Sequence, residues 1–255
     1  MITAPPQRAP RVIMRRSLPR PVTRSFAPTV VEEWHRLTAV PRLSLREGPR
    51  AFPLTLCSTA LIMVMWLAQM TQVGEAAVRL LGGVSAKLPL GVALLRLPGS
   101  MLAPAENLPA WGSLAQVLVV FGLAEAWFGA RRTLGIALAA TALSTLGGRG
   151  MYVLGPHHPL GLSLAEAGCL DTGPSAAVVA LMVYVCCRRQ AWLTLSALVA
   201  TMVGELIMLP NLAGREHIIA IVVGLAAASP LVVRRTQAKQ LARAGSAGRA
   251  VASPR

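Results

Sequence analysis

Six apolar stretches, separated by shorter polar segments, occupy most of the chain after its first fifty residues. Each has about 14 to 20 residues, near the length at which a helix rising ~1.5 Å per residue crosses a bilayer. The pattern therefore predicts an all-α polytopic membrane protein with six transmembrane helices. The predicted spans lie at about residues 54–70, 111–129, 133–148, 174–187, 191–209 and 216–233.

The segments around the spans divide the chain into three parts. Residues 1–51 are rich in Pro and Arg and have no sustained apolar period, which predicts a disordered basic cytoplasmic tail. Residues 52–235 form the membrane domain, and residues 236–255 are predicted to be a second disordered basic tail. Inside the membrane domain, residues 73–110 are apolar but broken by Gly and Pro, which fits a segment lying in the membrane plane, and residues 148–171 are predicted to be a loop.

Charge and apolarity are segregated along the chain. The chain has 25 Lys and Arg against 10 Asp and Glu, a net charge of +15, and 54% of its residues are hydrophobic. The basic residues lie in blocks beside the spans, which excludes a soluble globular enzyme and a nucleic-acid binder. With six spans and the N-terminus inside, 20 basic residues lie inside and 5 outside. The positive-inside rule therefore predicts cytoplasmic N- and C-termini.

The fourth span is short. From Ser175 to Arg188 there are 13 residues, about 20 Å of helix against a hydrocarbon core of about 30 Å. With Arg188 at the inner interface, Ser175 is predicted to lie roughly 10 Å below the outer one. The segment 168–173 must then enter the membrane as irregular backbone, which is tolerated where it is buried in protein or lines a wet cavity. Asp171 or Thr172 is expected to cap the helix that follows.

His217 is a second candidate for chemistry, because an ionisable group within a span is costly. Counting back from Arg234 puts it roughly 5 Å below the outer interface, near the depth of Ser175. A serine and a histidine at one depth supply a nucleophile and a general base. The alternative is an interfacial histidine and a serine that merely begins a helix.

Three stretches of the sequence resemble motifs of the rhomboid family of intramembrane serine proteases. Glu125, Gly129 and Arg132 form ExxxGxxR in the second span, and Gly173-Pro-Ser175 is similar to the first part of the GxSG nucleophile motif. In the sixth span, His217 and Gly224 match the histidine and the last glycine of AHxxGxxxG. The order of motifs matches as well, over about residues 52–235.

The resemblance implies a six-helix rhomboid-like bundle with a short central fourth helix in a bacterial plasma membrane. It also implies an intramembrane serine peptidase in which Ser175 attacks a transmembrane protein substrate, His217 moves the proton, and Ser113 and Gly173 support the oxyanion. Ala176 and Ala220 replace motif glycines, and Pro109 and Ser113 stand where the family has an oxyanion-binding His and Asn. These departures favour the alternative of a catalytically impaired rhomboid-fold protein that binds transmembrane clients.

The remaining polar residues of the membrane domain are assigned structural roles. Glu205 and Glu125 are expected to hydrogen-bond neighbouring helices. The adjacent His157 and His158 have no third ligand in the sequence pattern, and the four cysteines form no CxxC pair. The sequence therefore predicts neither a metal site nor a cofactor, and its expected partners are the lipid bilayer and transmembrane proteins.

Overall fold

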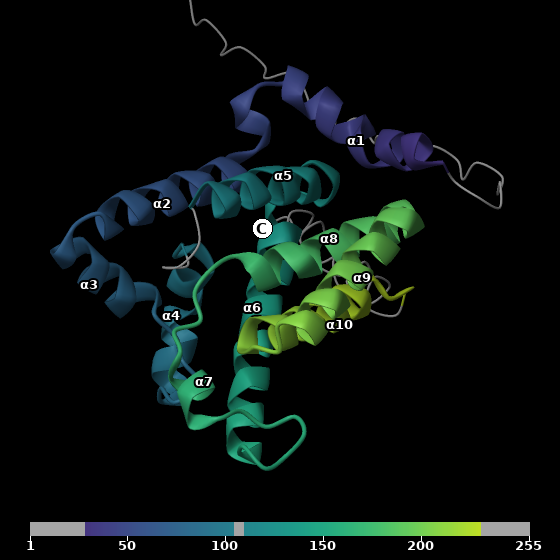
Figure 1. Ribbon diagram of the computed structural model, residues 1–255. Helices are drawn as coiled ribbons and strands as arrows, with labels where there is room; N and C mark the ends of the chain where they lie inside the picture. Colours follow the sequence, from purple (N-terminus) through teal and green to yellow (C-terminus); the bar gives the residue numbers. More distant parts are fainter. Residues whose placement is uncertain (1–28, 105–109, 231–255) are drawn as a thin grey trace, which may run out of the picture.

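The computed structural model describes residues 29–104 and 110–230, and within them it is built of α-helices with no β-strand. Figure 1 shows the helices stacked around α8. The helices are α1 (Val30–Arg46), the 3-10 helix η1 (Pro49–Ala51), α2 (Pro53–Gln69), α3 (Gln72–Gly82), α4 (Leu90–Leu102), α5 (Ala110–Phe128), α6 (Ala130–Leu154), α7 (Leu164–Gly168), α8 (Ser175–Arg189), α9 (Trp192–Met208) and α10 (Leu212–Ala228). The predicted all-α class is confirmed.

Four of the predicted spans, the first, second, fourth and fifth, coincide with α2, α5, α8 and α9 to within two residues. The third does not end at residue 148: α6 continues to Leu154, so the loop predicted over 148–171 is shorter than expected. Gly148, the first glycine of the predicted loop, is a packing position instead, since a Cβ there would lie 3.1 Å from Glu216 Oε1 and 3.2 Å from Leu212 Cδ1. The sixth helix begins four residues early, at Leu212, because Asn211 caps it by accepting a hydrogen bond from the Gly214 N–H at 2.8 Å.

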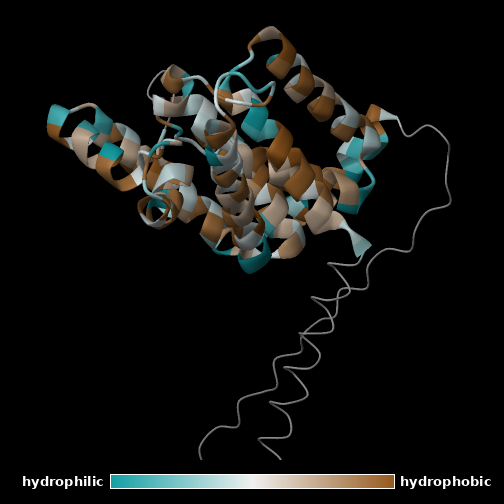
Figure 2. Ribbon diagram, turned by 90° about the horizontal axis from the view of Figure 1, so that it is seen from below, coloured by the Kyte–Doolittle hydropathy of each residue, from teal (hydrophilic) through white to brown (hydrophobic). Residues whose placement is uncertain are grey.

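By length and composition, one helix of the described residues is able to cross a membrane, and this is α5. Helices α2, α4 and α9 are apolar but shorter. Each of these helices has exposed large apolar side chains, among them Val64 of α2, Leu95 of α4 and Ile207 of α9. Residues of high hydropathy make up much of the ribbon in Figure 2. In α9 no residue is buried, although Trp192, Ile207 and Met208 are among its large apolar side chains.

Helix α8 lies at the centre of the bundle. Ten of its fifteen residues are buried, and it packs against α5, α6, α9 and α10. The buried positions are mostly Ala and Val, which have short side chains and allow neighbouring helices to approach closely. The centre of the fold is therefore the helix that begins with Ser175.

The structure corrects the prediction of a disordered tail over residues 1–51. Residues 30–46 form α1, whose first turn is capped by Thr29. The Leu37 carbonyl accepts a hydrogen bond from the indole N–H of Trp127 at 2.8 Å, and Glu33 reaches the beginning of α9. The Pro- and Arg-rich composition concealed this helix because its partners are 90 and 160 residues away. Residues 1–28 and the predicted tail 236–255 lie outside the described residues.

The connector at residues 73–110 folds into α3 and α4 as far as it is described. The turn between them runs beside the segment that leads into α8, where Val84 and Asp171 form an isolated antiparallel bridge. Arg149 of α6 donates a hydrogen bond to the Leu88 carbonyl and fixes the turn from the other side. The connector is therefore bonded both to the segment that leads into α8 and to α6.

Candidate functional site

Helices α8 and α10 pack closely against one another. A Cβ at Gly224 would lie 2.6 Å from the Ala180 carbonyl oxygen and 2.8 Å from Val183 Cβ, so only glycine fits there. Ala176 and Ala220, which stand where the resemblance expects glycine, are both buried in the apolar cluster between these helices. The alanines are thus accommodated, and the contact extends from Gly224 towards the beginnings of both helices.

The beginnings of α8 and α10 lie at the same end of the bundle. Asp171, four residues before Ser175, is within hydrogen-bonding reach of Glu216 and in electrostatic contact with His217. Figure 1 shows α8 and α10 entering the bundle from the same side. The two helices therefore run parallel, and Ser175 and His217 are both near this end. We call it the serine end, and define it by Asp171, Ser175, Glu205, Glu216 and His217.

The backbone before Ser175 is held by the connector. The Asp171 N–H donates to the Val84 carbonyl at 2.7 Å, and the Gly173 N–H donates to the Ser100 carbonyl at 2.9 Å. The Ser100 hydroxyl donates in turn to the Asp171 carbonyl at 3.2 Å. Gly173 has a φ of 128°, a conformation that favours glycine over other residues. This segment is irregular backbone that is fixed by hydrogen bonds to the connector.

Ser175 is the first residue of α8 and is half-buried. The predicted capping role of Asp171 or Thr172 is wrong: Pro174 is at the cap position, and no side chain caps the helix. Asp171 is turned away from the helix end because its backbone pairs with Val84 and its carboxyl group faces Glu216. The N–H groups of the first turn of α8 are consequently left for another acceptor.

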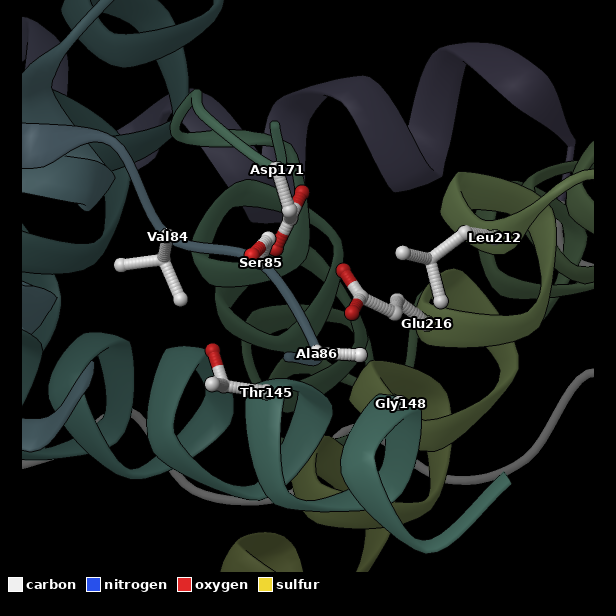
Figure 3. Close-up of a pocket in the computed structure, with 8 residues that line it drawn as sticks. All are labelled: Val84, Ser85, Ala86, Thr145, Gly148, Asp171, Leu212 and Glu216. Carbon is white, nitrogen blue, oxygen red and sulfur yellow. The ribbon is translucent and has the colours of Figure 1, made fainter. Parts of the chain in front are cut away.

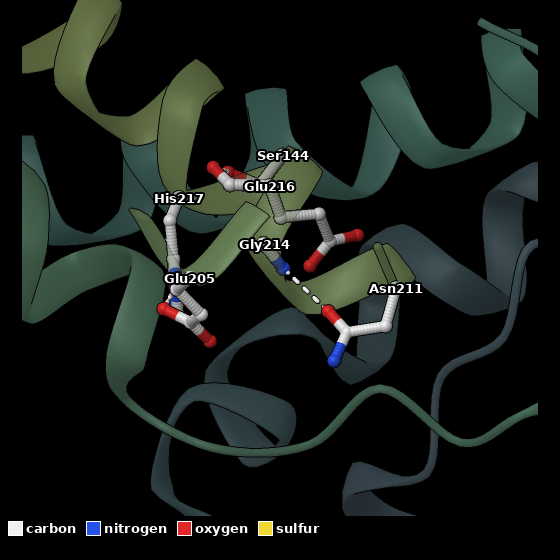
Figure 4. A network of polar contacts seen from close by, with 6 residues as sticks. All are labelled: Ser144, Glu205, Asn211, Gly214, Glu216 and His217. Carbon is white, nitrogen blue, oxygen red and sulfur yellow. Dashed lines mark hydrogen bonds and ion pairs between the residues drawn. The ribbon is translucent and has the colours of Figure 1, made fainter. Parts of the chain in front are cut away.

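His217 is 8% exposed and is oriented by a carboxylate from α9. Its Nδ1 lies 3.0 Å from Glu205 Oε2, as drawn in Figure 4. When Glu205 is ionised it can only accept, so Nδ1 carries the proton and Nε2 is the basic nitrogen. Nε2 is buried and has no hydrogen-bond partner within the described residues. The prediction that Glu205 hydrogen-bonds a neighbouring helix is confirmed, and its partner is the candidate base.

Ser175 and His217 are not hydrogen-bonded to one another in this structure, since Nε2 has no partner. They lie at one end of two parallel helices that pack directly together. Catalytic hydrogen bonds are often long without substrate and tighten when it binds. The arrangement supplies a hydroxyl, an oriented imidazole with an open nitrogen and the open N–H groups of a helix terminus.

The remaining motif residues have structural positions. The Glu125 carboxylate accepts hydrogen bonds from the N–H groups of Leu54 at 3.0 Å and Thr55 at 2.8 Å, and from the Thr55 hydroxyl at 2.7 Å. It thereby caps α2, which confirms that it hydrogen-bonds a neighbouring helix. Gly129 is the N-cap residue of α6 and has a φ of 80°, and Arg132 lies in the first turn of that helix.

The two positions expected to bind the oxyanion are not equally described. Ser113 is half-buried in the first turn of α5. Pro109 lies outside the described residues. Ser113 makes no hydrogen bond to any residue that the structure describes, so its hydroxyl has no assigned structural role.

Comparison with protein-family models, with curated proteins and with solved structures gives no match. The described residues contain no group of three or more His, Cys, Asp or Glu side chains able to hold a metal ion. Of the histidines predicted not to bind metal, His158 accepts a hydrogen bond from the Leu160 N–H at 3.1 Å within its own loop.

Two polar features of the serine end escaped the sequence analysis. One is the orientation of His217 by Glu205, which lies twelve residues before it on a different helix. The other is the pairing of Asp171 with Glu216 beside a small cavity, shown in Figure 3. The signal for both was the presence of carboxylates in or beside apolar stretches, where an acid without a partner is expensive.

Proposed function

We propose that this protein is a multi-pass membrane protein with a rhomboid-like arrangement and acts as an intramembrane serine peptidase. Ser175 is the nucleophile, His217 is the general base, and Glu205 orients the imidazole. The observation that carries the proposal is the His217 ring itself. It is buried, hydrogen-bonded to Glu205 through Nδ1 and without a partner at Nε2, on a helix packed against the one that Ser175 begins.

Membrane insertion is supported by the distribution of apolar surface. Helix α9 is apolar yet has no buried residue, and large apolar side chains are also exposed on α2 and α5. In water, exposed apolar surface of this extent would drive association, whereas lipid would cover it at no cost. The central α8 has fifteen residues, about 22 Å, which is shorter than a hydrocarbon core of about 30 Å. A helix of this length that ends at one membrane surface begins below the other surface. Ser175, at its beginning, would then lie in a part of the bundle that water reaches from that other side.

The proposed reaction is peptide hydrolysis through an acyl-enzyme. The Ser175 hydroxyl attacks the scissile carbonyl carbon while His217 Nε2 takes its proton. The negative charge on the oxygen is stabilised by N–H groups of the first turn of α8, which no side chain caps. His217 returns the proton to the leaving amine, the C–N bond breaks, and water then hydrolyses the ester and restores the Ser175 hydroxyl.

The experiment is a cleavage and labelling assay on the full chain reconstituted in liposomes. Wild-type protein should cleave a reporter with one transmembrane helix and should be labelled by a fluorophosphonate. Ser175→Ala should abolish labelling, and both Ser175→Ala and His217→Ala should lower cleavage by a factor of at least about 10³. Ser196→Ala, which alters an exposed serine of α9, is the matched control and should keep full activity.

Thermal unfolding of each variant separates chemistry from folding. Ser175→Ala removes one half-buried hydroxyl and should leave the unfolding midpoint unchanged within error. A wild-type protein that is folded in liposomes, resists the fluorophosphonate and cleaves no reporter would refute the peptidase proposal.

A second function, the binding of transmembrane clients without cleavage, is favoured by the identity of the oxyanion positions. Ser113 and Pro109 stand where the resemblance expects donors, and removal of one such donor typically costs about 10²–10³ in rate. Under this alternative, a client should be retained equally by wild type and by Ser175→Ala. Under the peptidase proposal, the uncleaved client should accumulate on Ser175→Ala only.

A further inference from the structure

A small, partly open cavity lies beside the candidate catalytic residues and is used by no step of the proposed reaction. Its lining combines four elements: the turn after α3, the middle of α6, the segment before α8 and the start of α10. The enclosed part has room for about one water-sized ligand. The residues that supply oxygen atoms to the lining are Ser85, Thr145, Asp171 and Glu216.

The two carboxyl groups of the cavity face each other. Figure 3 shows Asp171 and Glu216 pointing together from opposite walls, with Ser85 beside them. Glu216 is 4% exposed. No Lys or Arg of the described residues forms an ion pair with either group, and the only basic side chain in electrostatic contact with Asp171 is His217. Two carboxylates so close repel each other unless a cation or a proton lies between them.

Thr145 provides an independent sign of a ligand. Its side chain lines the cavity, is 5% exposed, and its hydroxyl oxygen has no hydrogen-bond partner within the described residues. An unsatisfied buried hydroxyl costs free energy, and threonines in helices commonly avoid this cost by donating to their own helix, as Thr141 does one turn earlier at 3.0 Å. In Figure 3 the Thr145 hydroxyl points into the cavity.

The cavity also keeps open the space next to the carboxylates. Gly148 lies one turn after Thr145 on α6, and a Cβ there would come within 3.1 Å of Glu216 Oε1. The Glu216 backbone is fixed separately, because its carbonyl accepts a hydrogen bond from Ser144 at 3.2 Å. The backbone of Glu216 is thus positioned by Ser144, and its carboxylate is available to a ligand in the cavity.

We propose that this cavity binds a hard divalent cation through the carboxylates of Asp171 and Glu216 and the hydroxyl of Thr145, with Ser85 beside it. Oxygen atoms are the ligands that Ca²⁺ and Mg²⁺ take, and two carboxylates neutralise a charge of +2. Water molecules at the open side complete the coordination. The site does not depend on the peptidase proposal, because none of these side chains takes part in the reaction.

The test is thermal unfolding of the full chain in detergent micelles, after treatment with a chelator, as CaCl₂ or MgCl₂ is added to millimolar concentration. Weak two-carboxylate sites bind in the range of about 10⁻⁴ to 10⁻³ M, so titration should reach saturation there. At millimolar cation the midpoint should rise by about 1–6 °C, and the ion giving the larger rise identifies the preferred size. Glu216→Gln and Asp171→Asn should abolish the rise, and Thr145→Val should reduce it.

Equilibrium dialysis with radioactive calcium gives a second measurement that does not require an unfolding transition, and it should find one site per chain in wild type and none in Glu216→Gln. Glu75→Gln is the matched control, since it removes an exposed carboxylate of α3 that pairs with Arg79 at 2.8 Å. It should keep the full midpoint rise. A wild-type midpoint that ignores both cations but rises as pH falls would overturn the proposal, because the two carboxyl groups would then share a proton.

Discussion

Buried carboxylates at the two ends of the bundle can be compared directly. At the end away from Ser175, Glu33 and Glu125 each accept two backbone N–H groups and one threonine hydroxyl at the beginning of another helix. At the serine end, Glu205 holds an imidazole whose other nitrogen is open, and Glu216 faces Asp171 across a cavity.

The partners of each carboxylate distinguish structural acids from candidate functional ones. We call the first end the capping end and define it by Glu33, Glu125, Trp127 and Arg189, whose guanidinium lies 3.6 Å from the Trp127 ring centre. There every carboxylate is satisfied by donors of the chain itself. The buried polar atom without a partner at the capping end is Arg189 Nε, a donor on a guanidinium stacked over Trp127. At the serine end it is His217 Nε2, the nitrogen able to accept a proton, and an open acceptor of this kind is typical of a site for chemistry.

The largest effect is expected for Glu205→Gln. If Glu205 orients the imidazole, its loss should lower kcat/KM by about 10²–10⁴, because the amide no longer selects the Nδ1–H tautomer. Stability should change little, since the carboxylate is partly exposed. Reporter cleavage in liposomes and thermal unfolding measure the two quantities. A cleavage rate within threefold of that of the wild type would contradict the role of Glu205 in orienting His217.

At the capping end, Glu125→Ala should lower the free energy of unfolding by about 3 kcal/mol, because three donors at the start of α2 lose their acceptor. Unfolding by detergent titration in mixed micelles measures this loss. Thr55→Val, which removes only the hydroxyl donor, should cost about 1 kcal/mol. Equal losses in the two variants would contradict the capping role.

Gly224→Ala tests the contact that brings the helices of the serine end together. The added Cβ meets backbone at 2.6 Å, so the helices must separate at a cost of about 1–3 kcal/mol, and peptidase activity should fall as well. Gly204→Ala is the matched control: nothing lies within 4 Å of that helical position, and the change should be neutral or stabilising. Similar stability of the two variants would show that the contact is not tight.

The smallest effect concerns Glu33 and pH. Burial alone would raise its pKa, but the hydrogen bonds from Leu193 and Thr194 prevail and lower the pKa of Glu33 below its ordinary value of 4.5. A carboxyl with a lowered pKa stabilises the fold above its unfolded value, and this contribution is lost as pH falls through the folded value. The difference in unfolding free energy between wild type and Glu33→Gln should therefore be constant above about pH 5 and shrink below it.

Glu32→Gln controls for the general effect of acid. Glu32 is exposed and its pairing with Arg36 at 3.8 Å is in solvent, so its removal should alter stability little at any pH. A difference in unfolding free energy between wild type and Glu33→Gln that grows as pH falls would contradict the capping of α9 by Glu33.

Much of the helical framework could be predicted from the chain because it depends on local apolar patterns. The boundaries of α2, α5, α8 and α9 came within two residues. The early start of α10 comes from a local cap, Asn211. Two other errors share a different cause, which is that contacts distant in sequence overrode a local signal. Gly148 begins the predicted loop but is a place where Leu212 and Glu216 pack, and α1 reads as disordered until Trp127 and α9 are present.

The candidate site was predicted in part. Ser175 and His217 were singled out by residue type and depth, and the described helices place both near one end of two packed, parallel helices. The Glu205 contact with His217 and the pairing of Asp171 with Glu216 were not predicted, because hydrogen-bond geometry between helices leaves no period in a sequence.

Most of the helix positions, and the residue types that are candidates for chemistry, follow from the identity and spacing of neighbouring residues and can be obtained from the chain alone. Only the tertiary structure decided which carboxylate meets which donor. Five of these acids, Glu33, Glu125, Asp171, Glu205 and Glu216, are buried or partly buried, and each must find a partner in space, whichever element that partner lies on.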